Sequence, residues 1–219
     1  IILLAAWEWS RLSACKNLPQ RFLYVGVQAA ILFIILPYFA YDVLFKLGLV
    51  FWLLLSAYLI WAGSKPVLPM ISPVITAGLG WLIISLCWVA LQKLQMTPVY
   101  LLFMLLIIWL ADTAPTLSPK KTWEGFIIGL LFTFFAAMLM FYFFQGVKPT
   151  LGQMCLLVLL TSLAAVAGDL FESQLKRLRG LKDSGQLLPG HGGILDRIDS
   201  LLAAAPVFTG SLLLLGLVT

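Results

Sequence analysis

Composition places this chain of 219 residues outside the range of soluble proteins, because 62% of its residues are hydrophobic and only 11% are charged. A soluble domain carries about a quarter charged residues, so the chain is predicted to be an integral membrane protein. Strand-like alternation of apolar and polar residues is absent, which argues against an outer-membrane barrel. The net charge of +5 fits basic residues that face anionic lipid headgroups or a phosphorylated ligand, and no nucleic-acid partner is expected.

The chain begins with IILLAAWEWS, and residues 1–9 are predicted to be the second half of a membrane helix, so the N-terminal helices are expected to be incomplete. Seven apolar runs follow, most of them near the length of about 20 residues that crosses the hydrocarbon core. They lie at 22–40, 44–62, 71–91, 98–111, 126–145, 151–168 and 200–218. The predicted fold is all-α: a polytopic helical bundle of about seven full spans plus the partial helix, in a single membrane-embedded domain over residues 1–219.

Basic residues are distributed unevenly between the loops on the two sides of this bundle. With strict alternation, one side receives 11 of the 14 lysines and arginines, and the other receives only Lys46, Lys93 and Lys148. The loops on the richer side are 10–21, 63–70, 112–125 and 169–199. The positive-inside rule places this side in the cytoplasm and the C-terminus outside.

The segment GILDRIDS places Asp196 and Asp199 three residues apart. If the segment is helical, both carboxylates project from one face and could share a divalent cation, for which oxygen ligands suit Mg²⁺. The same pattern fits an ordinary helix start, with acids near the positive end of the helix dipole and Arg197 pairing locally. Spacing alone leaves both interpretations open.

The segment PGHGG, residues 189–193, is rich in glycine and contains the only histidine of the chain, His191. Successive glycines allow backbone N–H groups to turn inward and form an anion-binding nest, although such a run is more often an ordinary loop. A lone histidine excludes a metal site built from several histidines. The residue could serve as an acid, donate to phosphate or hold the loop by hydrogen bonds, and the sequence favours the last.

Two basic segments lie on the predicted cytoplasmic side. ESQLKRLRGLKD, residues 172–183, gathers four cations that would either clamp phosphates or attract anionic lipids. SPKKTWEG, residues 118–125, joins two lysines to two hydroxyls as phosphate cradling requires, although it lacks the glycines of a P-loop. The ends of neighbouring spans add Asp112, Asp169 and Glu172. Together these groups predict a cytoplasmic pocket for metal-assisted handling of a polyphosphate.

The run from Ser173 to Asp199, through LKR, KDSG and LPGHGGILDRID, resembles the signature of phosphatidate cytidylyltransferases, also called CDP-diacylglycerol synthases. SPKKTWEG and GDLFES resemble flanking motifs of that family in the expected order. The resemblance covers residues 99–219 well, and the earlier helices match mainly in character. It implies a polytopic nucleotidyltransferase of phospholipid biosynthesis that makes CDP-diacylglycerol and pyrophosphate from CTP and phosphatidate with Mg²⁺, a second cation being left open.

The resemblance and the residue patterns together assign roles to named positions. The expected catalytic residues are Asp196, Asp199, Lys176, Arg177, Lys182 and Asp183. The residues expected to bind substrate are Lys120, Lys121, Ser118, Thr122, Asp112, His191, Gly192, Gly193 and Arg197. The residues expected to bind Mg²⁺ are Asp196, Asp199, Asp169 and Asp183. The expected partners are CTP, phosphatidate and the lipid bilayer, with a homodimer left open, and the expected location is a bacterial inner membrane with the active site facing the cytoplasm.

The chain departs from the family pattern after Asp112. The family has a longer loop containing glycine and lysine before SPKKT, whereas here only five residues separate Asp112 from Ser118. Three alternatives therefore remain beside the main prediction: a related CTP-dependent enzyme with another lipid acceptor, an inactive homologue, and a transporter. The transporter is least favoured, because ion paths need acids in mid-span and these acids lie in loops and at helix ends.

Overall fold

The computed structural model describes residues 1–39, 41–62, 71–117, 131–136, 138–139, 142, 149–185, 187 and 192–218, with only the backbone at 60, 62 and 112–117. Its regular elements are all helices. They are α1 Ile2–Leu12, α2 Leu18–Ala30, α3 Tyr41–Ala62, α4 Pro73–Gln95, α5 Pro98–Leu117, α7 Leu151–Leu178 and α8 Leu195–Leu214. Between α2 and α3 the chain continues as a π-helical segment, η1 Ile31–Ile35, and a 3₁₀ turn, η2 Leu36–Tyr38.

Five helical segments of the described chain are long and apolar enough to cross a membrane. They are Leu18–Tyr38, Tyr41–Leu59, Pro73–Gln95, Leu151–Leu178 and Leu195–Leu214, and the apolar helix Pro98–Ala111 is shorter. Each of these six segments overlaps a run predicted from hydropathy, which confirms an all-helical chain with several membrane-length helices. The remaining run, 126–145, lies largely outside the described residues, so the count of about seven spans stays a prediction.

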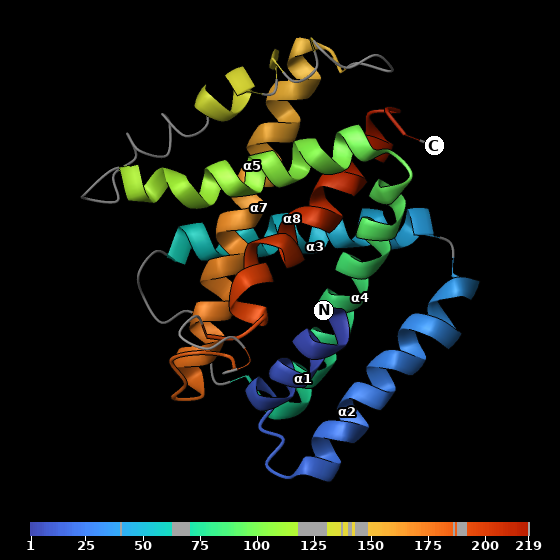
Figure 1. The fold of residues 1–219 in the computed structure, drawn as a ribbon, viewed down its shortest axis with the longest axis vertical. Helices are drawn as coiled ribbons and strands as arrows, with labels where there is room; N and C mark the ends of the chain where they lie inside the picture. The colour runs from blue at the N-terminus through green and yellow to red at the C-terminus, as the bar shows by residue number, and fades with distance from the viewer. Residues whose placement is uncertain are drawn as a thin grey trace.

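Helix α8 lies at the centre of the arrangement and packs against α7, α3, α4, α5 and α1. In Figure 1, α4 and α7 run mainly along the long axis of the molecule, and α3 and α5 cross that direction. Two glycines allow backbones to approach closely here. A Cβ atom on Gly168 of α7 would lie 2.5 Å from the carbonyl oxygen of Asp199, and one on Gly210 of α8 would lie 2.9 Å from that of Phe45. Helix α8 is therefore held between α7 and α3 at distances that larger residues would not permit.

The helix N-termini are satisfied in two different ways. Asn17 and Gln20 form a capping box at α2, Ser72 accepts a hydrogen bond at the start of α4, and Thr150 does so at α7. These side chains satisfy N–H groups that lack a partner within the helix. The residue before α8, Ile194, has no side chain that can do this, and α8 instead receives its acceptor from a distant part of the chain.

Two arginines join the loops at one end of the bundle. Arg179, just after α7, donates from Nε to the Leu12 carbonyl at 2.8 Å and from Nη2 to the Ile71 carbonyl at 3.0 Å. Arg11 donates from Nη1 to the Ser184 carbonyl at 3.0 Å. The ends of three of the four loops that were predicted to share one side therefore meet. In Figure 1 the C-terminal end of α5, which leads into the fourth loop, lies apart from the loops at the lower end of α7.

Candidate active site

The carboxylate of Asp196, in the first turn of α8, accepts hydrogen bonds from three groups. Lys176 Nζ lies 2.7 Å from its Oδ1, the Gly193 N–H lies 2.8 Å from its Oδ2, and the Ser184 N–H lies 3.2 and 3.1 Å from the two oxygens. The side chain is 14% exposed. Backbone N–H groups and an ammonium ion are strong partners for an ionised carboxylate, so Asp196 is fixed as an anion that still reaches the surface.

Lys176 lies between two carboxylates. Besides Asp196, its Nζ lies 2.5 Å from Oε2 of Glu172, which is one helical turn earlier on α7 and whose side chain is only 2% exposed. The ammonium group of Lys176 is thus held from two sides, by Glu172 on its own helix and by Asp196 on α8. Lys176 therefore lies against two carboxyl groups and does not project freely toward an anion.

The predicted glycine nest is partly filled by Asp196. Gly192 has a φ of 82°, a left-handed conformation that favours glycine, and a Cβ atom there would lie 3.0 Å from Asp196 Oδ2 and 3.8 Å from Asp183 Cβ. The Gly193 N–H donates to Asp196. The structure thus brings Asp183, Gly192, Gly193 and Asp196 together, and a carboxylate of the chain itself takes one of the nest's donors.

The other described site residues lie around this cluster and are more exposed. Asp199 is partly buried in α8, and its Oδ1 accepts from the Ser200 N–H at 2.7 Å. Asp169 accepts from Ser173 Oγ at 3.4 Å on the exposed face of α7. The exposed predicted residues are Asp169, Arg177, Lys182, Asp183 and Arg197. Ser118, Lys120, Lys121, Thr122 and His191 lie outside the described residues, and Asp112 belongs to α5 with only its backbone described.

Magnesium binding can be judged from the donor atoms present. Within the described ranges, no group of three or more His, Cys, Asp or Glu side chains could hold a metal ion. Mg²⁺ is usually bound by only one or two carboxylates, with substrate phosphates and waters completing its shell. A carboxylate offers about four lone-pair positions, and Asp196 already accepts two hydrogen bonds on each oxygen, so a metal ion there would replace one of these donors. Asp199 adds a second carboxylate one turn along α8. Asp196 and Asp199 thus supply the type and number of carboxylates that Mg²⁺ uses beside a phosphate ligand.

The sequence patterns did not assign a role to Glu8, which is 1% exposed in α1. Its Oε2 accepts from the Leu195 N–H at 2.7 Å and from Ser184 Oγ at 3.2 Å. The available signal was a single acid within the apolar run IILLAAWEWS, because an ionisable residue in such a run needs a partner. Arg179 is one of the four cations of residues 172–183, for which the sequence left phosphate binding and lipid attraction open, and its guanidinium donates to the Leu12 and Ile71 carbonyls and to Thr76 Oγ1.

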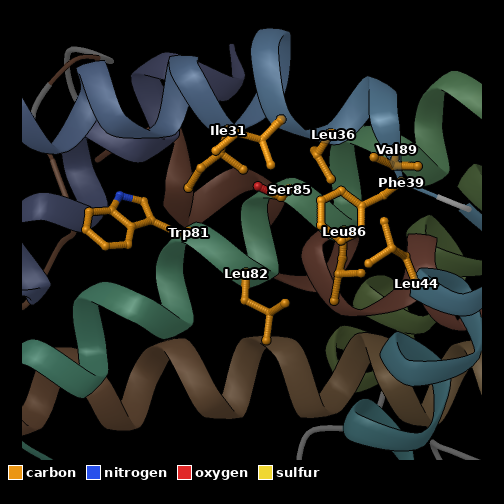
Figure 2. A pocket seen from close by; sticks show the side chains of 10 residues that line it. Ile31, Leu36, Phe39, Leu44, Trp81, Leu82, Ser85, Leu86 and Val89 are labelled. Atoms are coloured by element: carbon orange, nitrogen blue, oxygen red, sulfur yellow. The ribbon is translucent and has the colours of Figure 1, made fainter.

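An apolar pocket of about 240 Å³ lies elsewhere, between η1, η2 and α4. Figure 2 shows Trp81, Leu82 and Leu86 of α4 among its lining side chains, with Ile31 and Leu36 from the opposite segment. Its remaining lining residues are Ile35, Phe39, Leu44, Ser85 and Val89. The lining carries no charged group that could act on a phosphate, so the candidate chemistry belongs to the cluster around Asp196.

Comparison with known proteins supports the resemblance seen in the signature run. The model of the cytidylyltransferase family matches residues 1–215. The chain belongs to this family. The match extends from α1 to the end of α8, so it includes both the Asp196 cluster and Glu8.

Several proteins with the name phosphatidate cytidylyltransferase are similar to this chain. The phosphatidate cytidylyltransferase of Pseudomonas aeruginosa is 34% identical over 239 residues, which cover 97% of this chain and 84% of that protein. Those of Haemophilus influenzae and Staphylococcus aureus are 40% identical over 126 residues and 43% identical over 125 residues. These two matches cover 50% and 49% of this chain, and 44% and 46% of those proteins. The predicted resemblance is thereby confirmed.

Proposed function

We propose that this protein is a phosphatidate cytidylyltransferase, which transfers the cytidylyl group of CTP to phosphatidate and releases pyrophosphate. The observation that carries the proposal is the signature run between Ser173 and Asp199, which folds around a fixed Asp196 carboxylate and the Lys176 and Glu172 pair. The cluster lies at the ends of membrane-length helices, where a soluble nucleotide and a lipid phosphate can meet.

The reaction is an in-line displacement at the α-phosphorus of CTP. An oxygen of the phosphatidate phosphate forms the new P–O bond, the bond from the α-phosphorus to the oxygen bridging to the β-phosphorus breaks, and pyrophosphate leaves with the electron pair. A phosphate monoester has a second pKa near 6, so the nucleophile is already largely ionised at neutral pH and needs no general base. The demand on the protein is to neutralise and align two polyanions.

Basic side chains around the cluster would supply this neutralisation. Arg177, Lys182 and Arg197 are exposed near the signature loop, where long side chains can reach phosphate oxygens. Lys176, which contacts both Asp196 and Glu172, would instead hold these two carboxyl groups in place beside the bound substrates. The same proposal assigns Ser118, Lys120, Lys121, Thr122, Asp112, His191, Gly192 and Gly193 to substrate binding. For Asp112 this requires the C-terminal end of α5 to come closer to the signature loop than it lies in Figure 1.

Magnesium would be held by Asp196 and Asp199, with Asp169 or Asp183 as a further ligand. When bound, it would neutralise the CTP phosphates and polarise the α-phosphoryl group. The placement of both Asp196 and Asp199 in the first turns of α8, three residues apart, supports this assignment, and a second cation belongs to the same proposal. The proposed location is a bacterial inner membrane, with the loops joined by Arg11 and Arg179 facing the cytoplasm. The concentration of basic residues in the loops predicted on that side supports this orientation. The proposal also includes a homodimer, for which no interface is assigned.

The proposal is tested by measuring transfer of labelled CTP into lipid by the purified protein in detergent. Phosphatidate and Mg²⁺ are each added or withheld, and Asp196→Asn is assayed alongside. Label in the lipid phase only when both are present, and none with Asp196→Asn, is the expected result. Transfer to a different lipid acceptor would redirect the substrate assignment. Absence of transfer to any phospholipid would refute the enzyme activity itself.

A further inference from the structure

The N-terminal end of α8 needs an acceptor that its own sequence does not provide. Ile194 precedes the helix and cannot cap it, yet the first residues of α8 include Asp196 at the centre of the candidate site. The Leu195 N–H donates instead to Oε2 of Glu8, at 2.7 Å and 187 residues away in sequence. A carboxylate at this position also opposes the positive end of the helix dipole.

Glu8 contacts the same loop segments that orient Asp196. Ser184 donates its hydroxyl to Glu8 and its N–H to Asp196. Near the other end of the loop, the Leu195 N–H donates to Glu8 while the Gly193 N–H donates to Asp196. Glu8 therefore holds the two loop segments, at Ser184 and at 193–195, whose backbone N–H groups orient the carboxylate of Asp196.

The packing around Glu8 is too close for it to be a loosely placed side chain. A Cβ atom on Gly185 would collide with Glu8 Oε1, and one on Gly193 would collide with both Glu8 Oε2 and Ser184 Oγ. Arg11, one turn later on α1, donates to the Ser184 carbonyl at 3.0 Å. Helix α1 thus presents both an acceptor and a donor to this loop, and the lack of side chains at Gly185 and Gly193 leaves room for the Glu8 carboxylate.

We infer that Glu8 is a positioning residue of the transferase site, acting through the signature loop to hold Asp196 in its productive orientation. The expected loss of turnover rests on the proposed function, whereas the role of Glu8 in holding the loop around Asp196 does not. A displacement of about 1 Å at a reacting centre can lower a rate by about 10²-fold, so the loss of Glu8 should reduce turnover without removing any group that touches substrate.

The test compares Glu8→Gln and Glu8→Ala with a matched control, Gln28→Leu. Gln28 is fully buried in α2 and donates to Ser85 Oγ at 2.9 Å, so its replacement also deletes a buried hydrogen bond, but one remote from the loop. We expect Glu8→Gln to lower kcat by about tenfold or more with a smaller change in the KM for CTP, Glu8→Ala to lower it further, and Gln28→Leu to leave kcat near that of the unmodified protein.

Amide hydrogen exchange measures the stability of the loop around Asp196 directly and does not depend on the reaction. We expect exchange at residues 184 and 193–196 to rise by about tenfold in Glu8→Gln, with little change in residues 151–165 of α7. Unchanged exchange and kcat in Glu8→Gln would overturn the inference. Equal losses in Gln28→Leu would also overturn it, by revealing a general loss of stability. If the unmodified protein transfers no cytidylyl group, the proposed function fails, and the exchange measurement still decides whether Glu8 holds the loop.

Discussion

Replacing Gly168 by alanine tests the packing that places the Asp199 turn of α8 against α7. The added Cβ atom would lie 2.5 Å from the Asp199 carbonyl oxygen and 3.0 Å from Ala203 Cβ. Ordinary contacts begin at 3.4 Å, so α7 and α8 would have to separate by about 0.9 Å at this turn. The nearest obstacle is backbone, which cannot rotate away as a side chain can.

The expected cost of Gly168→Ala follows from that displacement. Overpacking of this kind costs about 1–3 kcal/mol of stability, and a shift near 1 Å beside Asp199 should lower the transfer rate by about 10²-fold. Thermal unfolding in detergent and incorporation of labelled CTP into lipid measure the two effects.

Gly152→Ala provides the matched control, because it is on the same helix and a Cβ atom there meets nothing within 4 Å. That change should leave activity intact and stabilise the helix slightly, since alanine loses less conformational freedom on folding. If Gly168→Ala behaved like Gly152→Ala in both measurements, the close approach of α7 and α8 and its link to the site would be refuted.

Asp196→Asn and Asp199→Asn should each reduce cytidylyl transfer by at least about 10²-fold while the protein remains monodisperse, and normal rates in both would remove them from the site. Lys93 lies in the last turn of α4, at the opposite end from the loops joined by Arg11 and Arg179, so Lys93→Ala should leave the transfer rate of the protein unchanged in the same assay. Arg179→Lys should lower the free energy of unfolding by about 2–4 kcal/mol, because one ammonium cannot reach the three oxygens that the guanidinium contacts. Thermal unfolding measures that loss. A stable variant with an abolished rate would instead assign Arg179 to substrate.

Hydropathy located the helices but not all of their ends. The run predicted at 71–91 corresponds to Pro73–Gln95, whereas that at 151–168 continues as a helix to Leu178. The extension is polar, and it stays helical because Glu172 and Lys176 are paired one turn apart. Likewise α8 begins at Leu195 rather than at 200, because its polar first turn finds acceptors in the folded chain.

The candidate site was only partly readable from the sequence. The sequence offered a shared helix face for Asp196 and Asp199 only as a condition, with the predicted span beginning at 200, and the structure places both residues in α8. The resemblance of the run from Ser173 to Asp199 identified the loop that surrounds Asp196. The partner of Leu195 could not be found in this way, because Glu8 is 187 residues distant and no periodicity links the two. The role of Arg179 could not be assigned for a similar reason, because an arginine in a basic segment looks the same in the sequence whether it contacts a ligand or backbone carbonyls. Tertiary contacts alone separate these cases.

The hydrogen bond between Glu8 and Leu195 has a consequence for biogenesis. Chains are synthesised at about 5–20 residues per second, so about 10–40 s pass between the synthesis of the glutamate and that of its partner. During that interval the carboxylate of α1 has neither Ser184 nor Leu195 as a donor, and it has to remain hydrated or held by the insertion machinery. Assembly of the site therefore waits until α8 packs against α1, and a chain arrested before α8 should display an accessible acidic group that the assembled α1 and α8 conceal.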